Sequence, residues 1–229
     1  MAKQNHQNIN SHNFETIKPI TLADSAYEKI RNAIILGELE FGEKLSELSL
    51  CEMFGISRSP IRSALTRLTS EGLIISQTNK SAYVWNPTSD DVLEIISLRR
   101  NLEILASEII ISKINEQDCM KMKEIIKMQE RAIEENNFLE LIHLDRKFHY
   151  LFVSKSNHSR LIKVWQMIMG QWEVLMHKRY KVNPILTRSV PEDHYEILNA
   201  FCSRDLETIR KLHYQINDRV TKELIASFI

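Results

Sequence analysis

The sequence predicts a mainly α-helical protein, in which an N-terminal winged helix-turn-helix precedes an all-helical bundle of six or seven helices. Three observations predict this fold class. The 229 residues include only five glycines and five prolines, which favours long helices over a many-stranded architecture. Apolar residues recur at helical spacing through most of the chain after residue 20. Two short β-prone runs interrupt this pattern after the third predicted helix, where a hairpin is expected.

The composition narrows the class of protein. Lysine plus arginine and aspartate plus glutamate number 30 each, so any nucleic-acid binding has to come from a local basic surface. No apolar run reaches the roughly 18 residues of a membrane span, and the polar N-terminus does not resemble a signal peptide. Three widely spaced cysteines, Cys51, Cys119 and Cys202, predict neither a disulfide framework nor a cysteine-rich metal site, so we expect a reducing cytoplasm.

The first predicted helix follows a polar segment. Residues 1–20 are rich in asparagine, glutamine and histidine, and we expect them to form a flexible arm. From Thr21 onward, one apolar stripe at helical spacing predicts a helix, which Gly37 ends. The stripe consists of Leu22, Ala26, Ile30, Ala33 and Ile34.

Two further helices are predicted before the hairpin. Residues 45–54 are typical of a short second helix with Ser46 as its N-cap, because a serine side chain accepts hydrogen bonds from the free amides of a first turn. Gly55 breaks this helix, and residues 56–70 are predicted to form the third. The buried side of the third helix is predicted to consist of Ile61, Ala64, Leu65 and Leu68.

The β-prone runs at 73–76 and 82–85 flank polar residues at 78–81, which predicts a hairpin. Three helices followed by a hairpin is the order of a winged helix-turn-helix. We therefore assign residues 21–85 to this domain and residues 86–90 to a linker, whose serine and aspartates are able to cap the next helix. Beyond the linker no strand is predicted, and helices are expected at 90–113, 115–136, 138–155, 158–181, 188–203 and 205–227.

The start of the third helix carries the side chains expected to contact DNA. Gly55 allows the sharp turn before this helix, and Ser57 is placed to cap it. The N-terminal residues of a recognition helix contact the bases, where arginine binds guanine edges or phosphates and hydroxyls bind phosphate oxygens. We therefore predict DNA contacts by Ser57, Arg58, Ser59 and Arg62, with backbone contacts added by Arg67 and Lys80. The alternative is that these arginines are solvated charges on a surface helix.

Residues 21–85 resemble the N-terminal domain of the GntR-type regulators. The resemblance rests on three motifs that occur in order, at residues 39–47, 55–62 and 68–74. It implies binding to double-stranded operator DNA as a homodimer, with repression as the commoner outcome. The sequence departs from the family pattern at Phe41, Leu48, Ser63 and Ser81, where a proline, a DNA-contacting arginine, a glutamate and a wing-tip glycine are usual.

Residues 91–229 are similar to the FCD class of C-terminal domains, found in the FadR-like branch of that family. The similarity is carried by residues 98–106, 144–149 and 192–200. It implies that this domain forms the dimer and binds an effector, which would be a small organic acid, a sugar acid or a fatty-acyl compound.

A metal site is suggested by Asp145 and His149, which are four residues apart and so project from one helix face. A carboxylate with several imidazoles suits Zn, Ni, Mn or Fe better than Ca or Mg. The FCD resemblance implies two further histidine ligands, one from each of the last two helices. His194 matches the first, whereas Ile216 stands at the second position and His213, one turn earlier, is the candidate substitute. The alternative is a site in the same cavity that uses no metal.

Arg99 is the best candidate to hold a carboxylate effector, because a guanidinium group binds a carboxylate bidentately. The alternative is a structural ion pair with Glu103, four residues later on the same helix. Trp165 and Trp172 either line a pocket or, as is commoner for such residues, belong to the bundle core or a dimer interface.

The sequence thus predicts a cytoplasmic transcription regulator, for which repression is the commoner outcome, whose operator affinity responds to a small organic acid, with or without a metal. Effector binding would reorient the helical domains and, through the linker, change the spacing of the two recognition helices. Two other classes stay open. A metal-dependent enzyme would use Asp145, His149 and His194, although no general-base motif such as HExxH accompanies them. A protein-interaction module without DNA binding also stays open, because Leu48 replaces the usual arginine and the net charge is neutral.

Overall fold

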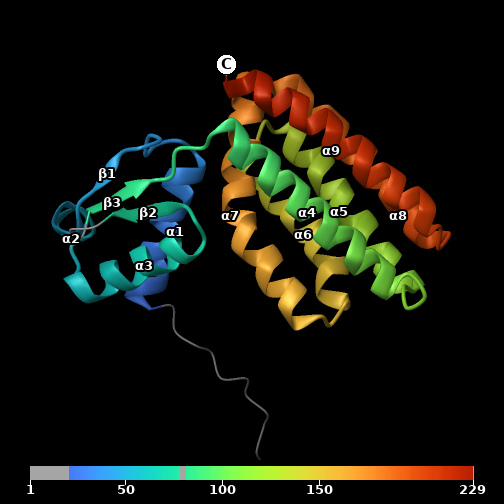
Figure 1. Ribbon diagram of the computed structural model, residues 1–229, viewed down its shortest axis with the longest axis horizontal. Helices are drawn as coiled ribbons and strands as arrows, with labels where there is room; N and C mark the ends of the chain where they lie inside the picture. Colours follow the sequence, from blue (N-terminus) through green and yellow to red (C-terminus); the bar gives the residue numbers. More distant parts are fainter. Residues whose placement is uncertain (1–20, 78–80, 229) are drawn as a thin grey trace, which may run out of the picture.

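The computed structural model describes residues 21–77 and 81–228, so the predicted arm at 1–20 and the wing residue Lys80 lie outside the described residues. The N-terminal part, on the left in Figure 1, confirms the predicted order of three helices and a hairpin. Its elements are α1 (Leu22–Ile35), β1 (Lys44–Leu45), α2 (Glu47–Phe54), α3 (Arg58–Ser70), β2 (Ile74–Gln77) and β3 (Ser81–Val84).

Strand β1 was not predicted, and it shortens the second helix. The sheet has the order β1-β3-β2, and both pairs of strands are antiparallel. Because Leu45 pairs with Ala82 in this sheet, α2 begins at Glu47 and not at residue 45. The N-cap prediction is confirmed, since the Ser46 side chain accepts a hydrogen bond from the amide of Ser49. A strand of two residues is too short to show the alternation by which strands are recognised in a sequence.

Helix α3 begins at Arg58, two residues later than predicted. Gly55 adopts a left-handed conformation with φ of 65°, which ends α2, and Ser57 is still extended before α3 begins. The predicted buried side is confirmed, because the side chains of Ile61, Ala64, Leu65 and Leu68 are all buried. This side of α3 packs against α1.

The helical part contains only helices among its described residues, as predicted. They are α4 (Ser89–Ile110), α5 (Glu116–Glu134), α6 (Phe138–Lys155), α7 (Ser159–Val182), the short 3-10 helix η1 (Pro184–Arg188), α8 (Ser189–Cys202) and α9 (Leu206–Phe228). Helix α4 starts inside the segment predicted as a linker, because Thr88 and Asp91 form a capping box at its first turn.

Helix α7 packs against other helices of the bundle on one side and against the N-terminal part on the other (Figure 1). Helix α4 packs against α9, α7 and α6, and α5 packs against α6 and α8. Helix α7 lies on the side of the bundle that faces the N-terminal part, and it contacts α1 there. Within the described residues, none of the helices combines the length and the hydropathy needed to cross a lipid bilayer.

The prediction that the cysteines do not pair is wrong for two of the three. Cys119, near the start of α5, and Cys202, at the end of α8, form a disulfide whose Cα atoms are 6.2 Å apart. The two residues are 83 positions apart, and cysteine spacing does not reveal which helices pack together. Cys51 on α2 is a free thiol.

Candidate DNA-contact face and buried ligand site

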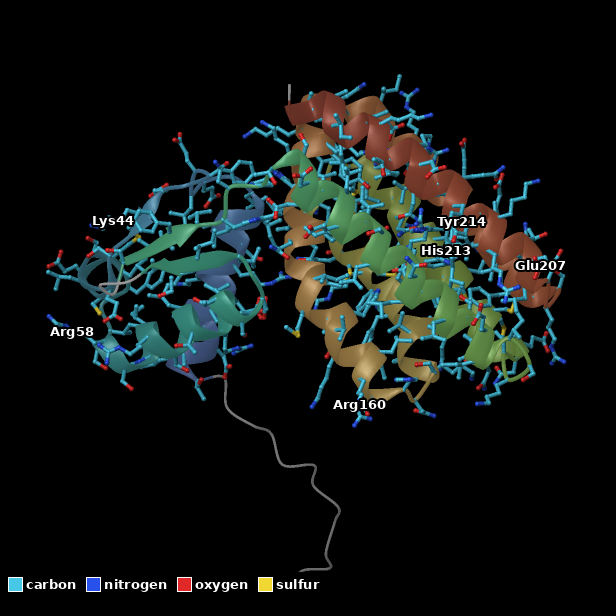
Figure 2. The ribbon with its side chains drawn as sticks, in the orientation of Figure 1. Lys44, Arg58, Arg160, Glu207, His213 and Tyr214 are labelled. Atoms are coloured by element: carbon cyan, nitrogen blue, oxygen red, sulfur yellow. A yellow bond between two sulfur atoms is a disulfide. The ribbon has the colours of Figure 1, made fainter. Side chains whose placement is uncertain are left out.

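The outer face of α3 gathers most of the side chains predicted to contact DNA. Ser57, Arg58, Ser59, Arg62 and Arg67 are all exposed. Four of them line one shallow hollow of about 640 Å³ together with two residues that were not predicted; the lining residues are Arg58, Ser59, Arg62, Ser63, Thr66 and Arg67. Figure 2 shows Arg58 at the outer end of α3, on the side away from the helical part. Hydroxyls and guanidinium groups on one convex helix are the donors that phosphates and base edges accept.

Two of these arginines already have partners within the N-terminal part. The Arg62 guanidinium lies 3.1 Å from Glu47 on α2, and that of Arg67 lies 2.7 Å from Asp24 on α1. These pairs are exposed, so a phosphate can compete for the arginines at little cost. Ser57 occupies the N-cap position of α3, but its side chain makes no capping hydrogen bond.

Leu48 stands on α2, where the family pattern has an arginine, and 53% of its surface is exposed. An exposed leucine offers no hydrogen bond or charge to a phosphate. The structure therefore has no cationic side chain at this position, as the departure in sequence predicts.

The second site lies inside the helical bundle, where three predicted metal ligands meet. Asp145 and His149 come from α6 and His194 from α8, and one ligand atom of each lies within 4.8 Å of the other two. The two imidazole Nε2 atoms are 3.2 Å apart. Asp145 Oδ1 is 3.7 Å from Nε2 of His149 and 3.4 Å from Nε2 of His194. All three side chains are buried.

Glu103 of α4 also lines this site, although the sequence indicated it only as an ion-pair partner of Arg99. Its Oε1 accepts hydrogen bonds from Arg99 Nε at 2.8 Å and from Trp165 Nε1 at 2.9 Å. Its Oε2 lies 3.0 Å from His149 Nδ1 and 3.6 Å from His213 Nδ1. Glu103 Oε2 therefore faces the Nδ1 atoms of both imidazoles, on the side from which a neighbouring carboxylate can orient a metal-binding histidine.

His213 of α9 lies in the same cavity but apart from the three converging ligands. Its Nε2 atom is buried and has no hydrogen-bond partner among the described residues. Ile216 also lines the cavity and offers no ligand atom. A further residue that the sequence did not single out is Gln129 of α5, whose side-chain oxygen lies 2.8 Å from Nδ1 of His194.

Arg99 is held by residues of the protein itself. Its guanidinium group pairs with Glu103, lies 3.3 Å from Asp145 Oδ2, and stacks on the Trp172 ring at 3.9 Å from the ring centroid. The ion pair with Glu103 that was held as the alternative is thus present. Trp172 lines the cavity and Trp165 is completely buried beside it.

The electrostatics keep the two carboxylates charged and keep His194 and His213 neutral. Burial acts to raise the pKa of Asp145 and of Glu103, but Arg99 and His149 outweigh it and hold both pKa values well below their usual range. Burial lowers the pKa of His194 and of His213 to about 4. At neutral pH both imidazoles therefore have a free lone pair, as a metal ligand requires.

The donor set fits a divalent transition metal. The Nε2 atoms of His149 and His194 lie 3.2 Å apart, and an oxygen of the Asp145 carboxylate completes three converging ligand atoms. The cavity has a volume of only about 40 Å³. That space is sufficient for an ion or a water molecule, whereas pockets for organic ligands are about ten times larger.

Both halves of the chain match a family model. Residues 22–84 match the model of the gntR family of bacterial regulatory proteins, and residues 94–218 match that of the FCD domain. The HTH-type transcriptional regulator YdhC of Bacillus subtilis is 31% identical over 212 residues, covering 92% of this chain and 85% of the relative.

Two further similarities extend over most of the chain. The gluconate operon transcriptional repressor of Bacillus subtilis is 29% identical over 200 residues, or 84% of this chain and 81% of the relative. The solved structure of McbR/YncC from E. coli matches with a TM-score of 0.79 at 22% identity, covering 92% of this chain and 100% of that one. The latter match concerns the fold alone.

Proposed function

The chain belongs to the GntR family of bacterial regulatory proteins and carries an FCD domain, and we propose from this premise that it is a ligand-responsive repressor. It is a DNA-binding transcription regulator, and relatives of similar length are named repressors. In the proposal it acts in the cytoplasm as a homodimer on an operator with two half-sites. The division into a DNA-binding domain at 21–85, a linker at 86–90 and a sensing domain at 91–229 is part of this proposal.

The DNA-contact face of the proposal is the outer side of α3. The observation that carries it is the hollow that unites Arg58 and Arg62 with three hydroxyl side chains on one exposed surface. This surface provides the local basic patch that a chain of zero net charge needs. Arg67 also lines the hollow. Ser57, at the N-cap of α3, is a further proposed contact, and Lys80 is retained as a proposed wing contact.

The effector site of the proposal is the buried cavity around Asp145. A divalent ion would be held by Asp145, His149 and His194, with His213 as a further candidate ligand. Such an ion, when bound, supplies a Lewis-acidic centre that attracts a carboxylate. Arg99 is the proposed guanidinium partner of the same carboxylate effector. Because the cavity holds only about 40 Å³, entry of an organic acid requires that the surrounding helices move apart.

A double Arg58→Ala, Arg62→Ala variant tests the DNA-binding face. Binding to the DNA upstream of its own gene is measured by fluorescence anisotropy at several salt concentrations. Each arginine is expected to contribute about 1–3 kcal/mol per protomer, and the variant should show a smaller salt dependence. A folded variant that binds this DNA as tightly as the parent would refute the proposed face.

Asp145→Asn tests the metal site, because the amide removes the charged ligand and changes little else in shape. Purified parent protein is titrated with Zn²⁺ by calorimetry, and bound metal is counted by mass spectrometry. The variant is expected to bind Zn²⁺ at least tenfold more weakly than the parent. Equal affinities would remove Asp145 from the set of ligands.

A further inference from the structure

Helix α7 separates the buried ligand site from the contact with the N-terminal part. On one side, Trp172 lines the site and donates a hydrogen bond from Nε1 to Asp145 Oδ2 at 3.2 Å. The next residue, Glu173, is completely buried and contacts the N-terminal part on the other side. Adjacent residues of one helix therefore belong to two different sites.

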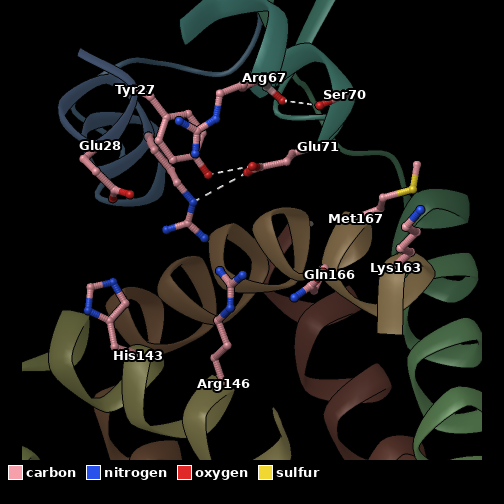
Figure 3. A pocket seen from close by; sticks show the side chains of 11 residues that line it. Tyr27, Glu28, Arg67, Ser70, Glu71, His143, Arg146, Lys163, Gln166 and Met167 are labelled. Atoms are coloured by element: carbon pink, nitrogen blue, oxygen red, sulfur yellow. Dashed lines mark hydrogen bonds and ion pairs between the residues drawn. The ribbon is translucent and has the colours of Figure 1, made fainter. Parts of the chain in front are cut away.

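Glu173 is the centre of an ion-pair network that joins the two parts. Its Oε2 accepts a short hydrogen bond from Nη2 of Arg31 on α1, and its Oε1 accepts one from Nη1 of Arg146 on α6 at 3.1 Å. Arg31 Nε also lies 3.7 Å from Glu71, whose carboxylate accepts a 2.6 Å hydrogen bond from the hydroxyl of Tyr27. We call these five residues the interface network; Figure 3 shows the Tyr27–Glu71 contact and the position of Arg146.

Helix α6, like α7, has neighbouring residues that belong to the ligand site and to the interface network. Arg146 follows Asp145 on α6, just as Glu173 follows Trp172 on α7. Asp145 and Trp172 contact each other inside the ligand site, and Arg146 and Glu173 contact each other at the interface. If α6 or α7 is displaced at the ligand site, Arg146 or Glu173 of the interface network is therefore displaced with it.

The backbone approaches closely at this interface, and open space lies beside it. A Cβ atom on Gly170 would lie 3.1 Å from the side chain of Leu73, and Gln171 donates a 3.2 Å hydrogen bond to the carbonyl of Gly72. Next to these contacts a cleft of about 810 Å³ separates α1 and α3 from α6 and α7 (Figure 3). The contact between the two parts is thus bordered on one side by open space.

Burial makes this contact sensitive to small displacements. The Glu173 side chain is 0% exposed and that of Arg31 is 5% exposed, so neither charge can exchange its partner for water without opening the interface. A buried carboxylate is stable only while its cationic partners remain within hydrogen-bond distance. The network therefore favours the arrangement of the two parts in which these charges stay paired.

We propose that Arg31, Glu173 and Arg146 are positioning residues that transmit occupancy of the Asp145 site to the orientation of the DNA-contact face. This inference rests on the proposed function, and it identifies the route by which the ligand site regulates DNA binding. A ligand that binds Asp145 or widens the cavity displaces α6 and α7. Arg146 and Glu173 pass this displacement to α1 through Arg31.

Glu173→Gln removes the central charge and preserves the shape of the side chain. Operator affinity is measured with and without Zn²⁺ for the parent and the variant, and Zn²⁺ affinity is measured separately by calorimetry. For the parent we expect Zn²⁺ to change operator affinity by about 5–150-fold. For the variant we expect Zn²⁺ affinity within about twofold of the parent and no response of operator affinity. A variant that responds as the parent does would overturn the inference.

Arg210→Gln is the control, because Arg210 forms an ion pair with Glu108 between α9 and α4, outside the interface. It should respond to Zn²⁺ as the parent does. Arg31→Lys, which retains a cation on α1, should keep more of the Zn²⁺-dependent change in operator affinity than Arg31→Met. If Arg31 had a purely structural role, both variants would lose the same fraction of folded protein. Zn²⁺ affinity and the response of operator affinity would then fall together.

A second measurement decides the inference even if Zn²⁺ fails to bind the parent, a result that would refute only the proposed metal site. Spin labels are placed by Glu52→Cys on α2 and Glu124→Cys on α5, both exposed, in a Cys51→Ser background. Distances between them are measured by pulsed electron resonance after dilution with unlabelled protein. We expect one narrow distribution for the parent and a broader or shifted one with Glu173→Gln. Identical distributions would overturn the inference.

Discussion

Each buried carboxylate of the ligand site is surrounded by the Arg99 guanidinium group and by imidazoles from more than one helix. Arg99 contacts both Glu103 and Asp145, and the imidazoles of His149 and His213 face Glu103. The site therefore contains more ionisable groups than three metal ligands require. Its stability as well as its ligand chemistry depends on these pairs being complete.

Glu103→Gln is expected to lower the free energy of unfolding by about 3–5 kcal/mol, because it leaves Arg99 and two imidazoles facing a neutral amide in a buried site. Urea denaturation of the metal-free protein measures this loss. Glu124→Gln, on the exposed side of α5, is the matched control and should change stability by no more than about 0.5 kcal/mol. Similar results for the two variants would show that Glu103 does not bear the charge balance of the site.

The two imidazoles with lowered pKa values provide a pH test. In the metal-free protein, NMR titration should place the pKa of His194 and of His213 at about 4, below the ordinary value of 6.5. Between these pH values the unfolded chain binds protons that the folded chain does not, so the histidine contribution to stability is lost as the pH falls through this window. Asp193, whose pKa burial raises to about 6, acts in the opposite direction, so the titration and not the net stability is decisive. Either imidazole titrating near 6.5 would contradict the prediction.

At the scale of elements, the helix starts are defined by side chains close in sequence. The Thr88 hydroxyl accepts from the amide of Asp91 at 3.2 Å, and the Asp91 carboxylate accepts from the amide of Thr88 at 2.8 Å. Thr21 with Asp24 and Asn115 with Asp118 form the same reciprocal pair at α1 and α5. This pattern satisfies amides that a helix leaves free at its first turn.

Thr88→Ala is expected to lower the free energy of unfolding by about 1 kcal/mol, because α4 loses its N-cap. Thermal or urea unfolding measures the difference. Thr221→Ala is the control, since among the described residues the Thr221 hydroxyl donates only to the carbonyl of Asn217 within α9, and its loss should cost no more than about 0.5 kcal/mol. A Thr88 variant as stable as this control would show that the cap does not contribute.

At the scale of the whole molecule, the disulfide between Cys119 and Cys202 connects helices whose other side chains shape the ligand site. Helix α5 provides Gln129 and helix α8 provides His194, and these two side chains are in contact. The disulfide and this contact together hold α5 and α8 at two levels of the bundle.

Reduction of the disulfide is expected to lower the free energy of unfolding by about 2–4 kcal/mol, because the link closes a long loop in the unfolded chain. Thiol titration of protein denatured without reductant should find one free thiol per chain, that of Cys51. A Cys119→Ser, Cys202→Ser variant should be insensitive to dithiothreitol, whereas the parent should not. Three free thiols in oxidised, purified protein would contradict the pairing.

The sequence by itself determined the features that depend on near neighbours. Periodicity defined the helices, and α6 was predicted with the bounds at which it is found, residues 138–155. The four-residue spacing of Asp145 and His149 placed both on one face of that helix, and motif order indicated both family domains. These inferences succeed because hydrogen bonds and side-chain spacing within a helix involve residues at most four positions apart.

Only the tertiary structure decided which distant residues meet. Trp165 and Glu103 are 62 positions apart, the two paired cysteines 83, and Arg31 and Glu173 142. Strand β1 likewise exists only because β3 lies beside it. Such contacts follow from how whole helices pack, so the spacing of residues in one sequence does not encode them. The charge balance of the ligand site and its connection to the DNA-contact face both depend on contacts of this kind.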